Sequence, residues 1–144
     1  MMNTSFADQA ATLEAEIENL FAVLAAETAR TQALKQEIRS LEMDLSEQWD
    51  SYEKRFAWAF GERGLYPEIP VRWYPVIFRL VERMDAALTA EQKVDFQFTQ
   101  IKEKHNRLRV YYNSDWTADK IIDPLIEQAE SEVETIEKLH KKLS

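Results

Sequence analysis

Residues 10–45 read AATLEAEIENLFAVLAAETARTQALKQEIRSLEMDL, and this stretch decides the fold. Leucine and isoleucine recur in it at alternating steps of three and four residues, which places them along one side of an α-helix. The seven-residue repeat fills the a and d positions of a coiled coil. We call these positions the seam: Ala10, Leu13, Ile17, Leu20, Leu24, Glu27, Thr31, Leu34, Ile38, Leu41 and Leu45.

The seam predicts self-association. No Gly or Pro interrupts the pattern before Gly61, so we expect a helix over residues 6–60 with Ser5 as its N-cap. At about 1.5 Å per residue this helix is roughly 75 to 80 Å long, whereas a compact chain of this size has a radius of roughly 15 Å. Because its own chain cannot cover it, we predict a homodimer whose contacts include Ile17, Leu20, Leu24, Leu34, Ile38, Leu41 and Leu45.

The orientation of the two helices follows from the charges beside the seam. In a parallel pair in register, Arg30 would face Lys35. Glu37 would face Glu42, and Glu27 would stack on its own copy inside the seam. Antiparallel pairing matches opposite charges instead, with Arg30 against Glu37 and Lys35 against Glu42. Ile at a and Leu at d favour the parallel dimer, and solvated charges contribute less than about 1 kcal/mol each. We favour the antiparallel arrangement.

The composition narrows the class of protein. The chain has 144 residues, of which 45% are hydrophobic and 31% charged, as in a single globular domain spanning residues 1–144. Two Gly and four Pro favour long helices, and the lack of Cys excludes disulfides and thiolate chemistry and fits a reducing cytoplasm. We find no signal peptide and no apolar run long enough for a membrane span. A net charge of -8 argues against a general nucleic-acid binder.

The second half predicts a compact part over residues 61–144 made of a helix, a hairpin and a helix. The first helix begins near Pro75, and its inward side chains include Leu80 and Met84. The last helix begins with Asp123 as cap and Pro124 at its first position, and it runs to Leu143. The predicted fold class is therefore mainly α with a small β-hairpin, an α+β fold.

The apolar stripe of the long helix widens beyond the seam at Phe21 and Val23. A stripe this wide indicates that a further helix packs there. We expect the last helix, with an apolar face that includes Ile126, Ala129 and Val133, to supply that contact.

Two segments of the second half carry a resemblance to a known group of proteins. WYPVIFRLVERMD and QIKEKHNRLRVYY resemble a segment of small phage and prophage proteins in which the hairpin reads approximately QVKEKFGGLRFYY. The resemblance covers residues 58–130, and His105, Asn106 and Arg107 stand where that pattern has Phe-Gly-Gly. It implies a viral or prophage context, hence the cytoplasm of a host cell, and it supplies no mechanism.

The predicted hairpin carries a cluster of basic side chains. VDFQFTQIKEK and RLRVYYN are β-rich runs joined through His105 and Asn106, and Asn tolerates the left-handed conformation of a tight turn. Pairing across this turn sets like charge against like charge, which indicates a docking patch for an anion or an acidic surface. Its residues are Lys102, Lys104, Arg107, Arg109 and Tyr111. The alternative is a solvated face neutralised by Glu103, Asp95 or the acidic last helix.

Other residues give weaker signals. Glu137 and His140 share one helix face, but a metal site in a bundle needs a second such pair, so we interpret them as part of a basic helix end. The many aromatic residues between Trp49 and Phe78 indicate core packing. Without a positioned base, nucleophile or glycine-rich loop, no catalytic residue, cofactor or metal is predicted.

Two functions are consistent with these patterns. The first is a non-enzymatic oligomeric binding protein, a phage accessory factor that inhibits or modulates a host protein such as a component of a defence system. Acidic mimicry of nucleic acid by a row of carboxylates would be one route, through Asp119, Asp123, Glu127, Glu130, Glu134 and Glu137. The alternative is binding of nucleic acid or a phosphate ligand through the basic hairpin, residues 102–109.

Overall fold

The structure, a computed structural model, describes residues 6–143 and, among these, the side chains of residues 7–142. Ser5, the expected N-cap, lies outside the described residues. The chain divides into two compact units, Met1–Leu41 and Glu42–Ser144. We call them the helical unit and the compact unit.

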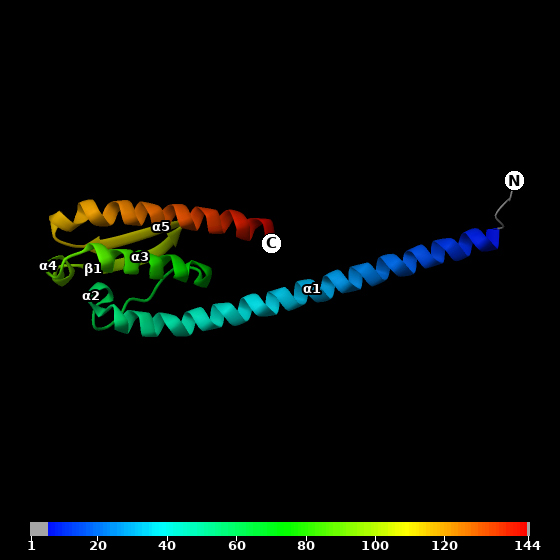
Figure 1. Cartoon of the computed structure of the whole chain (residues 1–144), viewed down its shortest axis with the longest axis horizontal. Coiled ribbons are helices and arrows are strands. Elements are labelled where there is room, and N and C mark those ends of the chain that lie inside the picture. The colour runs from blue at the N-terminus through cyan, green and yellow to red at the C-terminus, as the bar shows by residue number, and fades with distance from the viewer. Residues whose placement is uncertain (1–5, 144) are drawn as a thin grey trace. The chain divides into compact units, whose positions relative to one another are not determined.

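The first helix, α1 (Phe6–Arg55), runs without interruption and supplies the whole described part of the helical unit (Figure 1). Every side chain from residue 7 to residue 41 is exposed. Threonine hydroxyls along this stretch donate to carbonyl oxygens four residues earlier, for example Thr31 Oγ1 to the Glu27 carbonyl at 2.9 Å. The hydroxyl of a threonine in the seam is thereby satisfied within its own helix.

The stretch expected as one helix to residue 60 is divided at Phe56. α1 ends at Arg55, and α2 (Ala57–Phe60) follows before Gly61 adopts a positive φ of 82°. The backbone of Phe56 leaves the helical conformation, and its side chain is buried in the core. The sequence predicted that the compact part begins at residue 61, whereas the compact unit begins at residue 42. The reason is that Trp49, in the last turns of α1, already belongs to the core.

An extended segment between two prolines leads to the next helices. Glu68, between Pro67 and Pro70, donates its N–H to the carbonyl of Ile101 at 2.9 Å and accepts the N–H of Glu103 at 2.9 Å. The segment therefore pairs with the outer edge of the hairpin's first strand. A short 3₁₀ turn, η1 (Val71–Trp73), then leads directly into α3 (Tyr74–Ala87).

The hairpin forms where the sequence predicts it, with β1 (Gln97–Lys104) antiparallel to β2 (Arg107–Asn113). His105 and Asn106 both have positive φ, at 55° and 63°, as a two-residue hairpin turn requires. An irregularity between Phe98 and Gln100 shifts the alternation, so that Phe98 and Ile101 are both buried despite being three residues apart.

The last helix, α5 (Trp116–Leu143), begins eight residues before Pro124, the expected first position, so the prediction of Asp123 as its cap was wrong. Asp115 caps it, accepting the N–H of Thr117 at 3.1 Å and the Thr117 hydroxyl at 2.9 Å. Pro124 lies inside the helix on an exposed face. An internal proline costs about 3 kcal/mol, and burial of the continuous apolar face from Ala118 through Ile122 offsets that cost.

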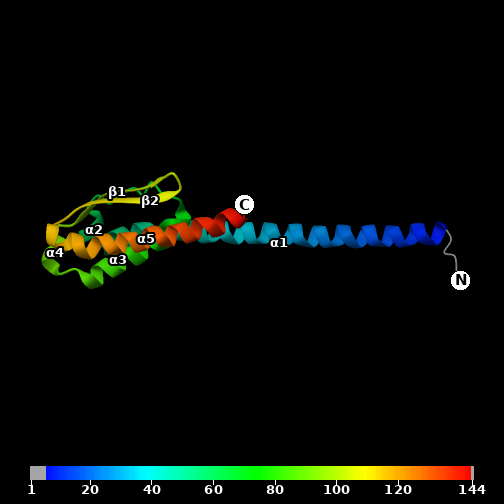
Figure 2. The same ribbon diagram turned by 90° about the horizontal axis from the view of Figure 1, so that it is seen from above.

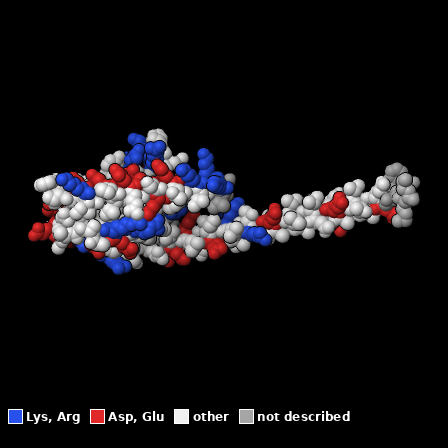
Figure 3. Space-filling view, turned by 45° about the horizontal axis from the view of Figure 1, so that its top comes forward, with Lys and Arg blue, Asp and Glu red and all other residues white. Residues whose placement is uncertain are grey.

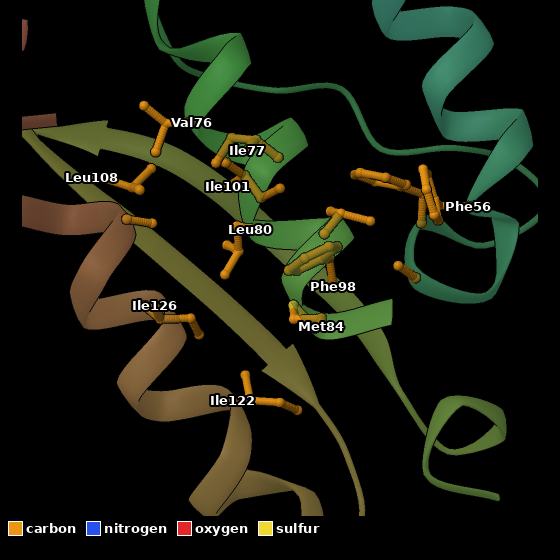
Figure 4. Close-up of a cluster of buried hydrophobic side chains, with 14 of the residues drawn as sticks. Phe56, Val76, Ile77, Leu80, Met84, Phe98, Ile101, Leu108, Ile122 and Ile126 are labelled. Atoms are coloured by element: carbon orange, nitrogen blue, oxygen red, sulfur yellow. The ribbon is translucent and has the colours of Figure 1, made fainter. Parts of the chain in front are cut away.

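One hydrophobic core holds the compact unit together. α3 and α5 run side by side, and the hairpin packs against them (Figures 1 and 2). Figure 4 shows Leu80 and Met84 of α3 meeting Ile101 of β1 and Ile122 of α5. A short helix that the sequence did not predict, α4 (Ala90–Val94), begins with a capping box between Thr89 and Gln92. The predicted α+β class, mainly α with one hairpin, is confirmed.

Candidate functional site

The hairpin register brings the predicted basic side chains onto one face. Lys102 pairs with Arg109 and Lys104 pairs with Arg107, as the two-residue turn requires. Gln100 pairs with Tyr111 in the same phase, two residues further along each strand. Ile101, Leu108 and Val110 have the opposite phase, and they pack in or against the core. We call the outward side chains the basic face: Lys102, Lys104, Arg107, Arg109 and Tyr111.

The four cations of the basic face form no ion pair with any residue in the described part of the chain. The Nζ of Lys102 lies 5.5 Å from the centroid of the Tyr111 ring, close enough for a cation–π interaction. The other three cations are held near one another by backbone pairing alone. Like charges directly opposite each other are unfavourable, so this face lowers its free energy when an anionic surface lies over it.

The acids expected to neutralise the basic face are used elsewhere or lie apart from it. The carboxylate of Glu103 accepts the backbone N–H of Asn106 at 2.7 Å and so stabilises the turn. Asp95 forms no ion pair with the hairpin within residues 6–143. Glu68, which the sequence did not single out, pairs through its backbone with Lys102. Its carboxylate accepts a hydrogen bond from Gln100 at 3.2 Å and forms no ion pair with the basic face among the described residues.

The carboxylates of α5 divide into two groups. Asp119 accepts a hydrogen bond from Ser114 and Asp123 accepts one from Tyr112. Burial first, and then the hydrogen bond to Asp123, raise the pKa of Tyr112 well above its ordinary value. Glu137 also has partners within the compact unit. Half of the row considered for nucleic-acid mimicry is therefore engaged inside the protein, whereas Glu127, Glu130 and Glu134 form no ion pair among the described residues.

Glu137 joins α5 to η1. Its carboxylate accepts two hydrogen bonds from Arg72, at 2.8 and 3.1 Å, and one from Nε1 of the buried Trp73 at 2.6 Å. The bonds from Arg72 hold the pKa of Glu137 below its ordinary value, against the opposing effect of burial, and His140 acts in the same direction as Arg72. The E-x-x-H spacing seen in the sequence thus contributes to a structural ion pair.

The seam residues of the helical unit lie on the surface of α1. The large apolar side chains of the seam from Leu13 to Leu41 are between 46% and 64% exposed, namely Leu13, Ile17, Leu20, Leu24, Leu34, Ile38 and Leu41. Leu45 is half-buried and belongs to the compact unit. Figure 3 shows this stretch as mostly uncharged surface with scattered acidic and basic side chains.

The apolar face of α5 was expected to cover the widened stripe of α1. Phe21 and Val23 are 67% and 55% exposed. The apolar face of α5, including Ile126, Ala129 and Val133, is instead buried in the core of the compact unit. Within the compact unit, the hairpin packs against this apolar face of α5.

Sequence reasoning missed two residues that shape the surface around the hairpin, Glu68 and Arg72. The signal for Glu68 was available, because a residue between two nearby prolines is held extended and can pair with a strand edge. Arg72 gave no signal, since its partner Glu137 lies 65 residues away in the chain.

The comparisons with known proteins add no family to these observations. Neither the family models, nor the curated proteins, nor the solved structures contain a match to the chain. Within residues 6–143, no three His, Asp or Glu side chains are grouped as a metal site would need. No helix in that range combines the length and apolar character needed to cross a membrane.

Proposed function

We propose that this protein is a self-associating binding protein without catalytic activity, which docks an acidic surface of a host-cell protein through its basic face. The observation that carries the proposal is the hairpin register, which sets four cations and a tyrosine on one face without an ion pair in the described chain. The resemblance to phage and prophage proteins favours a partner in the cytoplasm of a host cell, which this protein would inhibit or modulate.

The exposed seam supports a homodimer. Burying a leucine or isoleucine side chain contributes about 1.5–3 kcal/mol, and seven such side chains of the helical unit are largely exposed. A second copy supplies the same repeat, so each seam would cover the other. A Leu34→Asp variant should then be monomeric, as measured by light scattering at micromolar concentration. A monomer mass for the unmodified protein would refute the dimer.

The seam itself selects the register of an antiparallel pair. When the two helices cross at residue 29, Ile17 packs against Leu41 and Leu24 packs against Leu34. The same register sets Glu27 beside Thr31 in place of its own copy, which removes the stacking of two carboxylates. It does not align Arg30 with Glu37. Apolar burial decides the register, because an exposed ion pair contributes at most about 1 kcal/mol.

Cysteine cross-linking separates the two orientations, since the chain has no Cys of its own. In the register centred on residue 29, position 13 of one copy lies against position 45 of the other. A mixture of Leu13→Cys and Leu45→Cys chains should therefore cross-link between the two variants. Disulfides formed by either variant alone, joining identical positions, would show a parallel pair.

The partner-binding role is tested with two charge-matched variants. Lys102→Gln/Arg109→Gln removes two cations from the basic face, and Lys54→Gln/Lys120→Gln removes two exposed cations elsewhere in the compact unit. A host protein captured from lysate by the wild type should be lost by the first variant and kept by the second. The affinity between the captured host protein and this protein, measured with both purified, should weaken with rising salt. Equal retention by both variants would contradict the proposal.

Nucleic acid is the alternative occupant of the basic face, since phosphates are also anionic. Duplex binding at low salt that falls steeply as salt rises, and that the Lys102→Gln/Arg109→Gln variant loses, would establish that alternative. Absence of any duplex binding at low salt would leave the host protein as the partner.

A further inference from the structure

A second polar site lies beside the hairpin turn and shares only Arg107 with the basic face. A groove of about 650 Å³ is lined by η1, by the turn and by the carboxyl-terminal part of α5. This volume falls within the roughly 300–1,000 Å³ of small-ligand sites in proteins. All three segments belong to the compact unit.

The Arg72–Glu137 pair forms a fixed wall of the groove. Both charges are satisfied by the two hydrogen bonds between them, and the third bond, from Trp73, ties the carboxylate to a fully buried side chain. Because these hydrogen bonds already fix the Arg72 guanidinium and the Glu137 carboxylate, both groups require little reorganisation when a ligand enters.

Positive charge dominates the rest of the groove. Arg107, Lys138 and Lys141 line it, and against them stands the carboxylate of Glu134. Arg107 and Lys138 form no ion pair among residues 6–143. Asn106 adds an exposed side-chain amide at the turn. Setting the Arg72–Glu137 pair aside, three cations outnumber one anion.

Both histidines of the chain, His105 and His140, line this groove. They come from different elements, the turn and α5, and both are exposed. Histidine is the side-chain type that commonly gains charge between about pH 8 and pH 5. The charged groups lining the groove with them are Arg72, Arg107, Glu134, Glu137, Lys138 and Lys141.

Complementing the dipole of α5 explains only part of this arrangement. Cations near a helix carboxyl end are favourable there, which accounts for Lys138, His140 and Lys141. It does not account for His105 and Arg107, which the hairpin brings to the same groove from 31 or more residues away.

We propose that this groove binds a small polyanion, with pyrophosphate as the representative phosphate ligand, and that protonation of His105 and His140 strengthens the binding. Arg107 and Lys138 supply fixed positive charge, and the guanidinium of Arg107 can donate two hydrogen bonds to one phosphate group. The site is separate from the partner-binding role, although Arg107 belongs to both surfaces.

Calorimetric titration with pyrophosphate in low salt, at pH 6 and pH 8, tests the proposal. Wild-type protein should bind about tenfold more tightly at pH 6 than at pH 8. A His105→Gln/His140→Gln variant should bind no more tightly at pH 6 than at pH 8, because pyrophosphate itself loses negative charge as the pH falls. Binding that is absent at pH 6, or that strengthens at low pH without the histidines, would overturn the proposal.

Two further variants locate the binding. Arg107→Gln/Lys138→Gln should weaken pyrophosphate binding about tenfold or more at pH 6. Lys102→Gln/Arg109→Gln, which removes the same charge from the basic face outside the groove, should leave it unchanged. Equal loss in both variants would show a diffuse charge effect and sink the site. The second variant is also the one that should lose the protein partner, so the two proposals fail independently.

A titration with citrate distinguishes the kind of polyanion. Binding of pyrophosphate but not citrate would define a phosphate site, and binding of both through the same residues would define a general polyanion site. Tryptophan fluorescence controls for folding, because all four tryptophans lie in the compact unit. Citrate binding that survives the Arg107→Gln/Lys138→Gln change while pyrophosphate does not bind would count against the groove.

Discussion

The helical unit and the compact unit are built from the same apolar side chains with opposite outcomes. Leu20 in the seam is 64% exposed, and Leu80 in α3 is fully buried. Both follow a regular helical repeat. The difference is that the compact unit brings α5 and the hairpin onto α3, whereas nothing in the described chain buries the seam. An apolar repeat therefore predicts which face of a helix is to be buried, but it does not predict which element buries that face.

The largest expected effect contrasts these two leucines directly. Leu80→Ala should lower the free energy of unfolding of the compact unit by about 2–5 kcal/mol, because it removes buried methyl groups and leaves a cavity. Leu20→Ala should change that free energy by less than about 0.5 kcal/mol. Denaturant titration followed by tryptophan fluorescence reports on the compact unit alone, since Trp49 is the first tryptophan in the chain. Similar losses in the two variants would erase the distinction between the units.

A smaller effect is expected at the ion pair that closes the compact unit. Glu137→Gln should cost about 1–2 kcal/mol, since a charged acceptor for Arg72 and Trp73 becomes neutral. The depressed pKa of Glu137 means that the unfolded chain takes up its proton first as the pH falls. This stabilisation is complete above the ordinary value of 4.5 and is lost progressively below it.

Unfolding midpoints of wild type and Glu137→Gln between pH 7 and pH 3 check this dependence. The two should differ most near neutral pH and converge as the solution becomes acidic. A constant difference over the whole range would show that the charge of Glu137 contributes nothing. Glu27→Gln in the helical unit, an exposed seam residue, serves as the control and should leave the compact unit's midpoint unchanged.

The smallest effect is expected on the basic face. Lys102→Gln/Arg109→Gln should leave the free energy of unfolding unchanged, or raise it by a few tenths of a kcal/mol, because one directly opposed pair of like charges is relieved. The same denaturant titration measures it. A loss of several kcal/mol would show that these side chains stabilise the fold and would remove the reason to treat them as a docking surface.

Much of the fold was predictable because its signals are local. The hairpin register follows from the two-residue turn at His105 and Asn106, and the basic face follows from the register. The start of α5 was not, because Pro124 satisfies the rule for a first helical position equally well. Only the burial of Ala118 and Ile122 against the rest of the core shows that the helix begins earlier.

The groove beside the turn could not be predicted from local patterns. Its lining combines Arg72, the turn and residues near the end of α5, which meet only after the hairpin packs on the helices. In the sequence, His105 was noted as a turn residue and His140 as a neighbour of Glu137 on one helix face. Their presence in one groove depends on a tertiary arrangement that no spacing rule contains.

The two outer edges of the hairpin differ in their backbone hydrogen bonding. The outer edge of β1 is paired with Glu68, whereas within residues 6–143 the backbone of β2 pairs only with β1. An open strand edge is a template for unwanted pairing between copies. In the register centred on Leu108, two copies of β2 laid antiparallel would set Arg107 of one against Arg109 of the other, and their repulsion opposes that pairing. Like charge along β2 therefore disfavours edge-to-edge pairing of two hairpins, which agrees with the proposal that copies associate through the seam of α1.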